Sequence, residues 1–493
     1  MPEPLLIGLD IGSRHVKAGV LRADGTVLAV ARRPTPLVAL PDGGQVHPPA
    51  DLFAAAEGVV RDAVADATAS GADGSAVVGI GIASVAEAGV PVDAAGEPIG
   101  DVLAWHDPRP APDVALLTAA VPVDRLFART GLRAEAKHTL AKLAWLRRTE
   151  PERLRRATAW AGVADLIALR WTGRLATAAS QACRTLAWDL ASGEWAADLL
   201  ALAEWSPDRM PEVVPADAPT GHLRQAAADR LGLRAGIPVA VAGHDHVVGA
   251  FGAGASEPGD VVDSMGTAEA ILRVTAGPCL DDAVRRRGFS TGAHVATGRW
   301  YVLGGAAASG ALVEWYLDLI AASASPTQRY ERLHALVADA GVPTGLVVRP
   351  TPRGRAAPLP DPDGRASIEG LDLETDAARL GRAVLEGVAF HARWMLDELA
   401  ALTSARIDDV RLIGGGVADA PLVAIKSALG PGTVRAVQEP EAVIVGAALV
   451  AGLASGVYGS VDEAVAIAPP AVPVEHRLDA SAYQQAYERW RPR

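Results

Sequence analysis

Residues 5–20 read LLIGLDIGSRHVKAGV, in which two apolar stretches flank a short polar segment. We interpret them as a buried strand, a tight turn and a second strand. The turn contains Asp10, Gly12 and Ser13. A glycine turn presents backbone N–H groups beside a carboxylate that can hold a hydrated Mg²⁺. The pattern Asp-x-Gly-Ser also occurs in ordinary β-turns, so alone it fits either a plain hairpin or a nucleotide phosphate site.

A second copy of this pattern favours the phosphate site. Residues 261–272 again contain an apolar strand, a small polar turn with Gly266 and Thr267, and another strand. Both halves of the chain therefore begin with a hairpin and continue as strands and helices. We predict two related α/β domains that face each other across a cleft, with the join near residues 235–245.

The periodicity of apolar residues predicts the other elements. A Pro-rich segment, residues 349–364, is expected to be a long surface loop, and loops of that length are often functional. Residues 115–205 are expected to be mainly helical. Strands are expected at 27–32, 77–84, 238–242, 299–303 and 410–413, a hairpin at 91–99, and helices at 49–70, 377–403 and 421–429.

Length and composition exclude several classes of protein. The chain has 493 residues, which is long for one core, and a net charge of -12 without basic runs beyond Arg285–Arg287, so nucleic acid is not an expected partner. Two cysteines and no secretory leader predict a reduced, cytoplasmic protein without disulfides or structural zinc. The uncharged stretch 442–460 lacks aromatic and basic flanks, so we expect a buried helix rather than a membrane span.

Asp245 is the candidate catalytic carboxylate. It follows the apolar strand 238–242 within Gly243-His244-Asp245-His246, directly before a helical pattern. A carboxylate at this place faces the crevice where α/β folds bind ligands, and it could accept a proton from a substrate hydroxyl; it could also be a plain helix N-cap. The two histidines have no third ligand at a suitable spacing, so we expect them to orient Asp245 or the substrate rather than hold a metal.

In their order along the chain, these motifs resemble those of the FGGY carbohydrate kinases, which belong to the actin-like ATPase superfamily. The resemblance rests on six segments: Asp10 to Lys17 for the first phosphate motif, Gly243 to Asp245 for the catalytic motif, Ser264 to Thr267 for the second phosphate motif, Gly304 to Gly310 with Trp315, Ile368 to Gly387, and Gly414-Gly415-Gly416 after a strand. It covers nearly the whole chain. Two departures, Arg379 and Lys426-Ser427, are expected on helices outside the reacting groups.

The resemblance implies an α/β fold of two actin-like (ribonuclease H-like) domains, each a mixed sheet flanked by helices. The domains would span residues 1–241 and 242–475, followed by a C-terminal helix and tail, 476–493. The implied reaction is ATP-dependent phosphorylation of a hydroxyl of a ketose, polyol or sugar acid, with closure of the domains on the bound sugar. Asp245 would be the general base and Asp10 would hold Mg²⁺ through water. The implied nucleotide contacts are Gly12, Ser13, Arg14, Lys17, Gly266, Thr267, Gly310, Gly414, Gly415 and Gly416.

The acceptor pocket of such kinases is lined by the loop after an early strand, here residues 83–89. Relatives that use xylulose or gluconate carry a Met-His pair in this loop and glycerol kinases an Arg-Glu pair, and this chain has neither. The candidate substrate contacts are Glu87, Trp105, Asp107, Asp245 and His246. Glu87 could equally be an exposed loop carboxylate, and Asp107 with Arg109 could shape the loop. A ketose or a short polyol is favoured.

Two other functions compete with this interpretation. An actin-like ATPase or nucleotide-gated interaction protein would share the fold but not the small-molecule pocket. A sugar-binding transcriptional regulator would normally bring a helix-turn-helix and a cysteine-rich zinc motif, and neither is present. The expected partner is a small sugar or polyol, with neither nucleic acid nor membrane, and a homodimer is left open.

Overall fold

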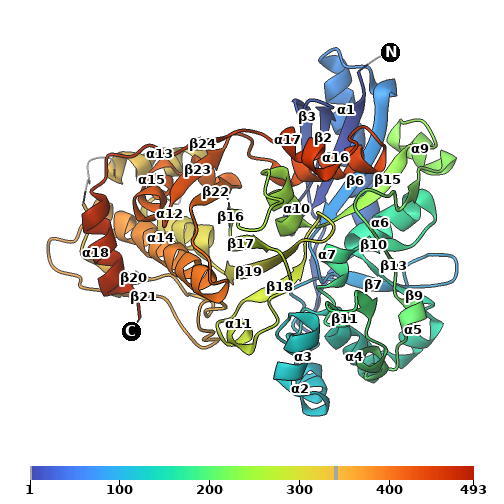
Figure 1. The fold of residues 1–493 in the computed structure, drawn as a ribbon, viewed down its shortest axis with the longest axis horizontal. Helices are drawn as coiled ribbons and strands as arrows, with labels where there is room; N and C mark the ends of the chain where they lie inside the picture. The colour runs from blue at the N-terminus through green and yellow to red at the C-terminus, as the bar shows by residue number, and fades with distance from the viewer. Residues whose placement is uncertain (1–2, 322, 338–341, 493) are drawn as a thin grey trace.

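The computed structural model describes residues 3–321, 323–337 and 342–492. Its first sheet is built on the segment that opens the chain (Figure 1). Strand β1 (Leu5–Ile11) pairs antiparallel with β2 (His15–Arg22), which pairs with β3 (Val27–Pro34). On its other side β1 runs parallel to β6 (Val77–Ser84), and β6 runs parallel to β15 (Pro238–His244), with β14 (Gly221–His222) at the edge. Every residue of β1 is buried.

The second sheet repeats this plan. Strand β16 (Val261–Met265) forms an antiparallel hairpin with β17 (Glu269–Thr275), and the sheet continues through β19 (Trp300–Ala306) and β18 (Ser290–Ala293). On the other side of β16 lie parallel β22 (Asp409–Ile413) and β23 (Thr433–Val437), then β24 (Ala471–Pro473). The repeat that the sequence predicts is confirmed: the chain is α/β with two mixed sheets.

Helices and three smaller sheets surround the first sheet. A five-stranded sheet contains β4 (Val38–Ala39), β5 (Gln45–His47), β8 (Val102–Leu103), β7 (Gly89–Val92) and β9 (Ala159–Gly162), and two-stranded pairs are β10 (Ala176–Ala178) with β13 (Glu212–Val214) and β11 (Trp188–Asp189) with β12 (Glu194–Trp195). The helices are α1 (Pro49–Ala69), α2 (Ala111–Ala120), α3 (Val123–Thr130), α4 (Thr139–Thr149), α5 (Pro151–Arg156), α6 (Val163–Thr172), α7 (Ala179–Ala182), α8 (Ala197–Ala201) and α9 (Gln225–Leu231). Short 3-10 turns lie at Gly74–Ala76 and Pro207–Arg209.

The second half contributes longer helices and one further hairpin, β20 (Val347–Arg349) with β21 (Ser367–Glu369). Its helices are α10 (Asp245–Gly252), α11 (Asp282–Arg286), α12 (Ser309–Ala321), α13 (Pro326–Val337), α14 (Ala377–Leu402), α15 (Ala420–Leu429), α16 (Ala442–Ala454), α17 (Val461–Ala466) and α18 (Ala480–Trp490), with a 3-10 turn at Gly415–Ala418. Helices α12, α14, α15 and α18 lie together at the end of the molecule away from the first sheet (Figure 1).

The expected elements agree closely with these bounds. The strand at 77–84 and the helices at 49–70, 377–403 and 421–429 are each reproduced within one residue. The segment 115–205 is helical as expected, but it also contains β9 to β12, whose short lengths give little periodic signal. Strand β15 runs to His244 within the first sheet, so the expected division after residue 241 falls inside a strand of that sheet.

Helix α16 connects the two halves. It comes from the second half of the chain but packs closely on the first sheet. A Cβ atom added to Gly8 would lie 2.0 Å from the carbonyl oxygen of Ile444, and one added to Gly81 would lie 1.9 Å from that of Ala447. The prediction of a buried helix within residues 442–460 is confirmed. None of the helices in the described ranges is long and apolar enough to cross a membrane.

Candidate active site

Three neighbouring parallel strands, β1, β6 and β15, bring candidate residues to one edge of the first sheet. In the register of these strands Asp10 is opposite Ala83, and Ser84 is opposite His244, directly before Asp245. Because parallel strands point the same way, the turn after Asp10, the loop after Ser84 and the start of α10 meet at the carboxyl ends of the strands. Ligands of α/β folds commonly bind at this edge.

Asp10 is buried and incompletely paired. Its Oδ1 atom accepts no hydrogen bond from the described residues. Burial, together with the charge of Asp245, raises the pKa of Asp10 to about 8, although Lys17 opposes both effects. Because the charge of Asp245 changes the pKa of Asp10, the two carboxylates lie close enough to interact electrostatically. A buried carboxylate oxygen without a donor suits a cation, so Asp10 fits the role of a Mg²⁺ holder through water.

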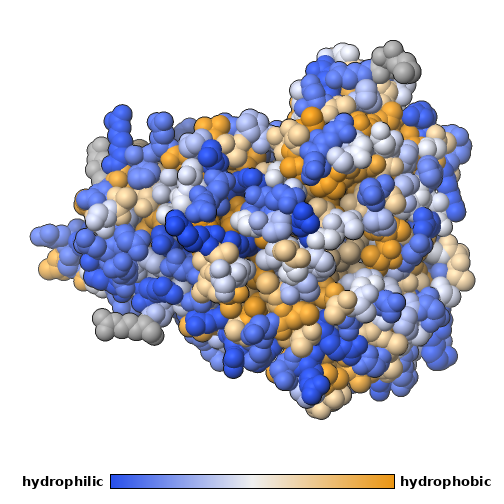
Figure 2. Space-filling view, viewed as in Figure 1, coloured by the Kyte–Doolittle hydropathy of each residue, from blue (hydrophilic) through white to orange (hydrophobic). Residues whose placement is uncertain are grey.

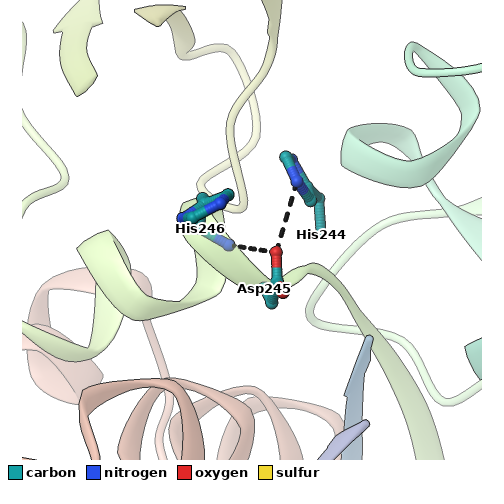
Figure 3. Close-up of side chains that lie close together, drawn as sticks. All are labelled: His244, Asp245 and His246. Atoms are coloured by element: carbon teal, nitrogen blue, oxygen red, sulfur yellow. Dashed lines mark hydrogen bonds and ion pairs between the residues drawn. The ribbon is translucent and has the colours of Figure 1, made fainter. Parts of the chain in front are cut away.

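Asp245 is the first residue of α10, and its neighbours fix its carboxylate. Oδ1 accepts a 2.7 Å hydrogen bond from the backbone N–H of His246 and lies 3.3 Å from Nε2 of His244; Figure 3 shows both contacts. The α10 N-cap is His244, so the alternative of Asp245 as a plain N-cap is wrong. Burial raises the pKa of Asp245, partly offset by His246, which makes the carboxylate a stronger base.

The histidines beside Asp245 are closer to a ligand set than the sequence suggested. One ligand atom each from His244, Asp245 and His246 lies within 4.8 Å of the others, so Asp245 is a third potential ligand beside the two histidines. Burial lowers the pKa of His244 well below its ordinary value and keeps the ring neutral. A neutral ring with its proton on Nε2 donates to Asp245, which agrees with the expected orienting role.

The first phosphate turn is open to solvent. Gly12 donates its N–H to the carbonyl of His15 at 3.0 Å, which closes the turn and leaves Ser13 and Arg14 exposed. Lys17, on β2, does not point freely at a ligand: its Nζ lies 2.6 Å from Oε2 of Glu441, just before α16. Glu441 was not foreseen, because it is 424 residues away in sequence.

The second half assembles its own group of backbone turns. The N–H of Gly310 donates to the carbonyl of Gly266 at 3.2 Å, and a Cβ atom at Gly310 would lie 2.5 Å from that oxygen. Gly414 has a φ of 86°, and a Cβ atom added to it would lie 2.8 Å from the carbonyl oxygen of Met265. A Cβ atom added to Gly415 would have no neighbouring atom within 4 Å. The structure therefore brings the turn with Gly266 and Thr267 together with Gly310 and Gly414–Gly416, and leaves open backbone at Gly415.

Lys426 lies under this turn and not at the surface. It is on helix α15, as expected, but Nζ donates to Oδ2 of Asp263 and to Oε1 of Glu269, each at 2.5 Å, in the core of the domain. This ion-paired group joins α15 to the β16–β17 hairpin. Arg379, the other departure, lies at the surface of α14, where it pairs with Asp372 at 3.0 Å.

The loop after β6 holds Glu87 inside the molecule. Its backbone has a positive φ of 64°, and Nε and Nη2 of Arg184 both donate to its Oε1 atom, at 2.9 and 2.6 Å. Lys142 donates to the backbone carbonyl of Glu87, and burial lowers the pKa of Lys142 to about 7. The alternative of an exposed loop carboxylate is wrong, because only 7% of the Glu87 side chain is accessible.

Two further candidates lie in the loop before α2. Trp105 is 37% exposed, and its Nε1 donates to Oγ of Ser13 at 3.1 Å, so the indole touches the first phosphate turn. Asp107 is buried, and its oxygens accept from Arg109, with a shortest distance of 2.6 Å. Asp107 therefore shapes this loop through Arg109, and its contact with substrate stays a prediction.

Residues of the mainly helical segment also lie at this site, although their sequence pattern did not single them out. Arg184 is the most important, and Ser180 accepts a 3.2 Å hydrogen bond from the backbone N–H of His244, beside the candidate base. Gln181 donates to Ser84 at the end of β6. A signal was present, because Arg184 is the only charged residue in the apolar stretch 176–188, and a lone charge of this kind is usually paired.

Comparison with known proteins agrees with this geometry. Models of the N-terminal and C-terminal domains of the FGGY family of carbohydrate kinases match residues 5–252 and 261–455. A glycerol kinase from Ralstonia nicotianae is 31% identical, covering 93% of this chain and 91% of the relative, and one from Delftia acidovorans is 30% identical, covering 94% and 93%.

Solved structures show the same fold. A xylulose kinase from Rhodospirillum rubrum has a TM-score of 0.86 at 28% identity and covers 99% of this chain and 97% of its own. A gluconate kinase from Lactobacillus acidophilus has a TM-score of 0.88 at 18% identity over 99% and 97%, which shows the fold alone. With both family domains matched in order along one chain, this protein belongs to the FGGY family of carbohydrate kinases.

Proposed function

We propose that this carbohydrate kinase transfers the terminal phosphoryl group of ATP to a hydroxyl of a neutral ketose or short polyol, with Asp245 as the general base. The observation that carries the proposal is the position of Asp245, buried at the start of α10 with a raised pKa and close enough to Asp10 to raise the pKa of that carboxyl as well. A base with a pKa nearer to neutrality accepts the hydroxyl proton more readily as the phosphoryl group arrives.

The two open turns supply the groups that would hold the nucleotide. Backbone N–H groups near Gly12 and Ser13, and near Gly266 and Thr267, would bind its phosphates, and Gly414 to Gly416 would lie against its adenosine. Mg²⁺, held through water by Asp10, would neutralise phosphate charge. Most of the rate would then come from positioning and charge stabilisation, because phosphoryl transfer leaves the protein little covalent chemistry. Lys17 would leave Glu441 to contact the nucleotide.

Charge favours a neutral acceptor over a sugar acid. Asp10, Asp245 and Glu87 are acidic groups at this edge of the sheet, and the nearby guanidinium of Arg184 is already paired with Glu87. Both hydrogen bonds from Arg184 reach Oε1, which leaves Oε2 of Glu87 for a substrate hydroxyl. Trp105 offers a flat apolar surface for one face of the carbon skeleton. An acidic substrate would need a further cation here.

The competing functions have less support. The relatives and the solved structures named above are kinases of glycerol, xylulose and gluconate, which favours a kinase over a non-catalytic actin-like protein. The Glu87–Arg184 pair beside Asp245 also suits a small-molecule pocket better than a filament contact. An ATPase whose rate no polyol or ketose changes would favour the competing function.

The test is the substitution Asp245→Asn, which keeps the size of the side chain and removes the base. ADP formation is measured with glycerol, xylulose and gluconate as acceptors, and ATP binding by calorimetry. We expect turnover with the best acceptor to fall by roughly 10²–10⁴-fold while ATP still binds. The control is Asp217→Asn at an exposed position, which leaves turnover unchanged. Full turnover by the Asp245 variant, or gluconate as the best acceptor, contradicts the proposal.

A further inference from the structure

We propose that the second domain contains an anion site, outside the catalytic cleft, that binds a small phosphate monoester. The site is a cavity of about 350 Å³ beneath the Pro-rich loop that follows β20, a segment to which the catalytic mechanism assigns no role. Its walls come from that loop, from the middle of α14 and from the end of α18. A cavity of this size is within the range that small ligands occupy.

Three arginines line this cavity without a carboxylate partner. No carboxylate of the described residues lies within ion-pair distance of Arg349, Arg355 or Arg365, although the chain as a whole is acidic. Burial lowers the pKa of Arg349; the carboxylate of Glu369, outside the lining, opposes this shift, and the charge of Arg355 adds to it, so the two cations repel each other. Among the described residues of the lining, Asp361 alone is acidic. An anion would relieve this repulsion.

Two of the three guanidinium groups are held in place before a ligand binds. The guanidinium carbon of Arg349 lies 4.7 Å from the ring centre of Trp490, and the same guanidinium donates to the Trp490 carbonyl. The guanidinium carbon of Arg355 lies 5.2 Å from the ring centre of Trp394, and Nε of Arg355 donates to the carbonyl of Leu359 at 2.7 Å. Each guanidinium has five N–H groups, and these contacts use one of them, so the other donors remain for a ligand. Little side-chain entropy would then be lost on binding.

The charge and the volume together specify the ligand class. The lining holds three arginines and one aspartate, and Glu369 lies near Arg349 outside it, so the excess of positive charge suits an anion. His391 adds no charge, because burial lowers its pKa more than the 2.8 Å hydrogen bond to the carbonyl of Ala357 raises it. Guanidinium forks bind phosphate with two parallel hydrogen bonds. The end of the molecule that carries α18 is mainly hydrophilic on the face in Figure 2, which suits a polar ligand better than an apolar partner.

The test compares binding of glycerol 3-phosphate, inorganic phosphate and glycerol by calorimetry. We expect glycerol 3-phosphate to bind a site outside the cleft, inorganic phosphate to bind it more weakly, and glycerol not to bind it. The double variant Arg355→Gln/Arg365→Gln should weaken this binding by at least about tenfold while turnover without added phosphate ester stays unchanged. The matched control is Arg353→Gln, on the same loop but not in the lining, which should bind as the original protein does.

Several outcomes would overturn the assignment. If the double variant binds the ester with unchanged affinity, the ester binds elsewhere. If the Arg353 control loses as much affinity as the double variant, the effect comes from the overall positive charge of the loop and not from this site. Equal affinity for inorganic phosphate overturns the assignment to an ester. If the double variant does not fold, Arg365→Gln alone decides, because Arg365 is exposed and, among the described residues, it donates only to carbonyls of its own loop.

Discussion

Arg184 holds Glu87 through two hydrogen bonds to a single carboxylate oxygen, and the two side chains are each only 7% accessible. The pair joins the segment after α7 to the loop after β6, which are 97 residues apart in sequence. The position of the proposed acceptor carboxylate therefore depends on a cation that comes from another part of the domain.

Removing that cation should harm both stability and acceptor binding. Arg184→Met leaves a buried carboxylate unpaired, so we expect a loss of about 3–5 kcal/mol in the free energy of unfolding and a raised KM for the acceptor with little change in the KM for ATP. Denaturant titration and steady-state kinetics measure these effects. The control Arg406→Met breaks the ion pair with Asp408, whose side chains are 90% (Arg406) and 80% (Asp408) accessible, and it should lower the free energy of unfolding by less than about 1 kcal/mol. Equal effects of the two substitutions would contradict this role of Arg184.

Lys426→Met should destabilise the second domain in a pH-dependent way. The substitution leaves Asp263 and Glu269 buried together without a cation, at an expected cost of about 3–5 kcal/mol at neutral pH. Burial, with Glu269, already raises the pKa of Asp263 to about 8. With Lys426 in place the pKa of Glu269 is lowered; without it the pKa of both carboxyls should rise above the unfolded-state values, so stability falls as pH rises. Denaturation at pH 5 and pH 8 should show the larger loss at pH 8, and the reverse order would refute this explanation.

Asp165→Asn should remove a different pH dependence. Asp165 accepts the N–H of Gly162 at 3.0 Å at the start of α6, and burial raises its pKa from 3.8 to about 6. Since the folded state keeps this proton to a higher pH than the unfolded chain, its ionisation lowers stability as pH rises from 3.8 through 6. Asparagine retains the acceptor without the charge, so the variant should gain up to about 3 kcal/mol above that range. Exposed Asp66→Asn is the control, and an unchanged stability profile would count against the assignment.

Gly446→Ala tests the contact between α10 and α16. A Cβ atom at this position would lie 2.0 Å from the carbonyl oxygen of Val248, so one helix must shift, at an expected cost of about 1–3 kcal/mol. Because α10 begins at Asp245, kcat should fall as well. Thermal unfolding and kinetics measure the two effects. Gly277→Ala meets nothing within 4 Å and should change neither, and a neutral Gly446 variant would show that the helices can separate without cost.

Local pattern was sufficient for much of the fold. The apolar runs around Asp10 and Gly266 predict both hairpins, because alternation of buried and polar residues is a property of neighbouring residues. The same holds for the strand before Asp245, and for the helix that begins at Ala377. The expected loop at 349–364 lies between β20 and β21, but its basic cavity was not foreseen, since the walls also include residues of α14 and α18.

The amino-acid sequence by itself determined the order of strands, turns and helices, the repeat of the hairpin in both halves, and the family of the protein. Only the tertiary structure decided that Arg184 pairs with Glu87, that Lys426 joins Asp263 and Glu269, and that α16 lies on the sheet of the other half. The reason is physical. Periodicity reports which face of an element is buried, whereas ion pairs and helix contacts between distant segments depend on how the buried faces pack together.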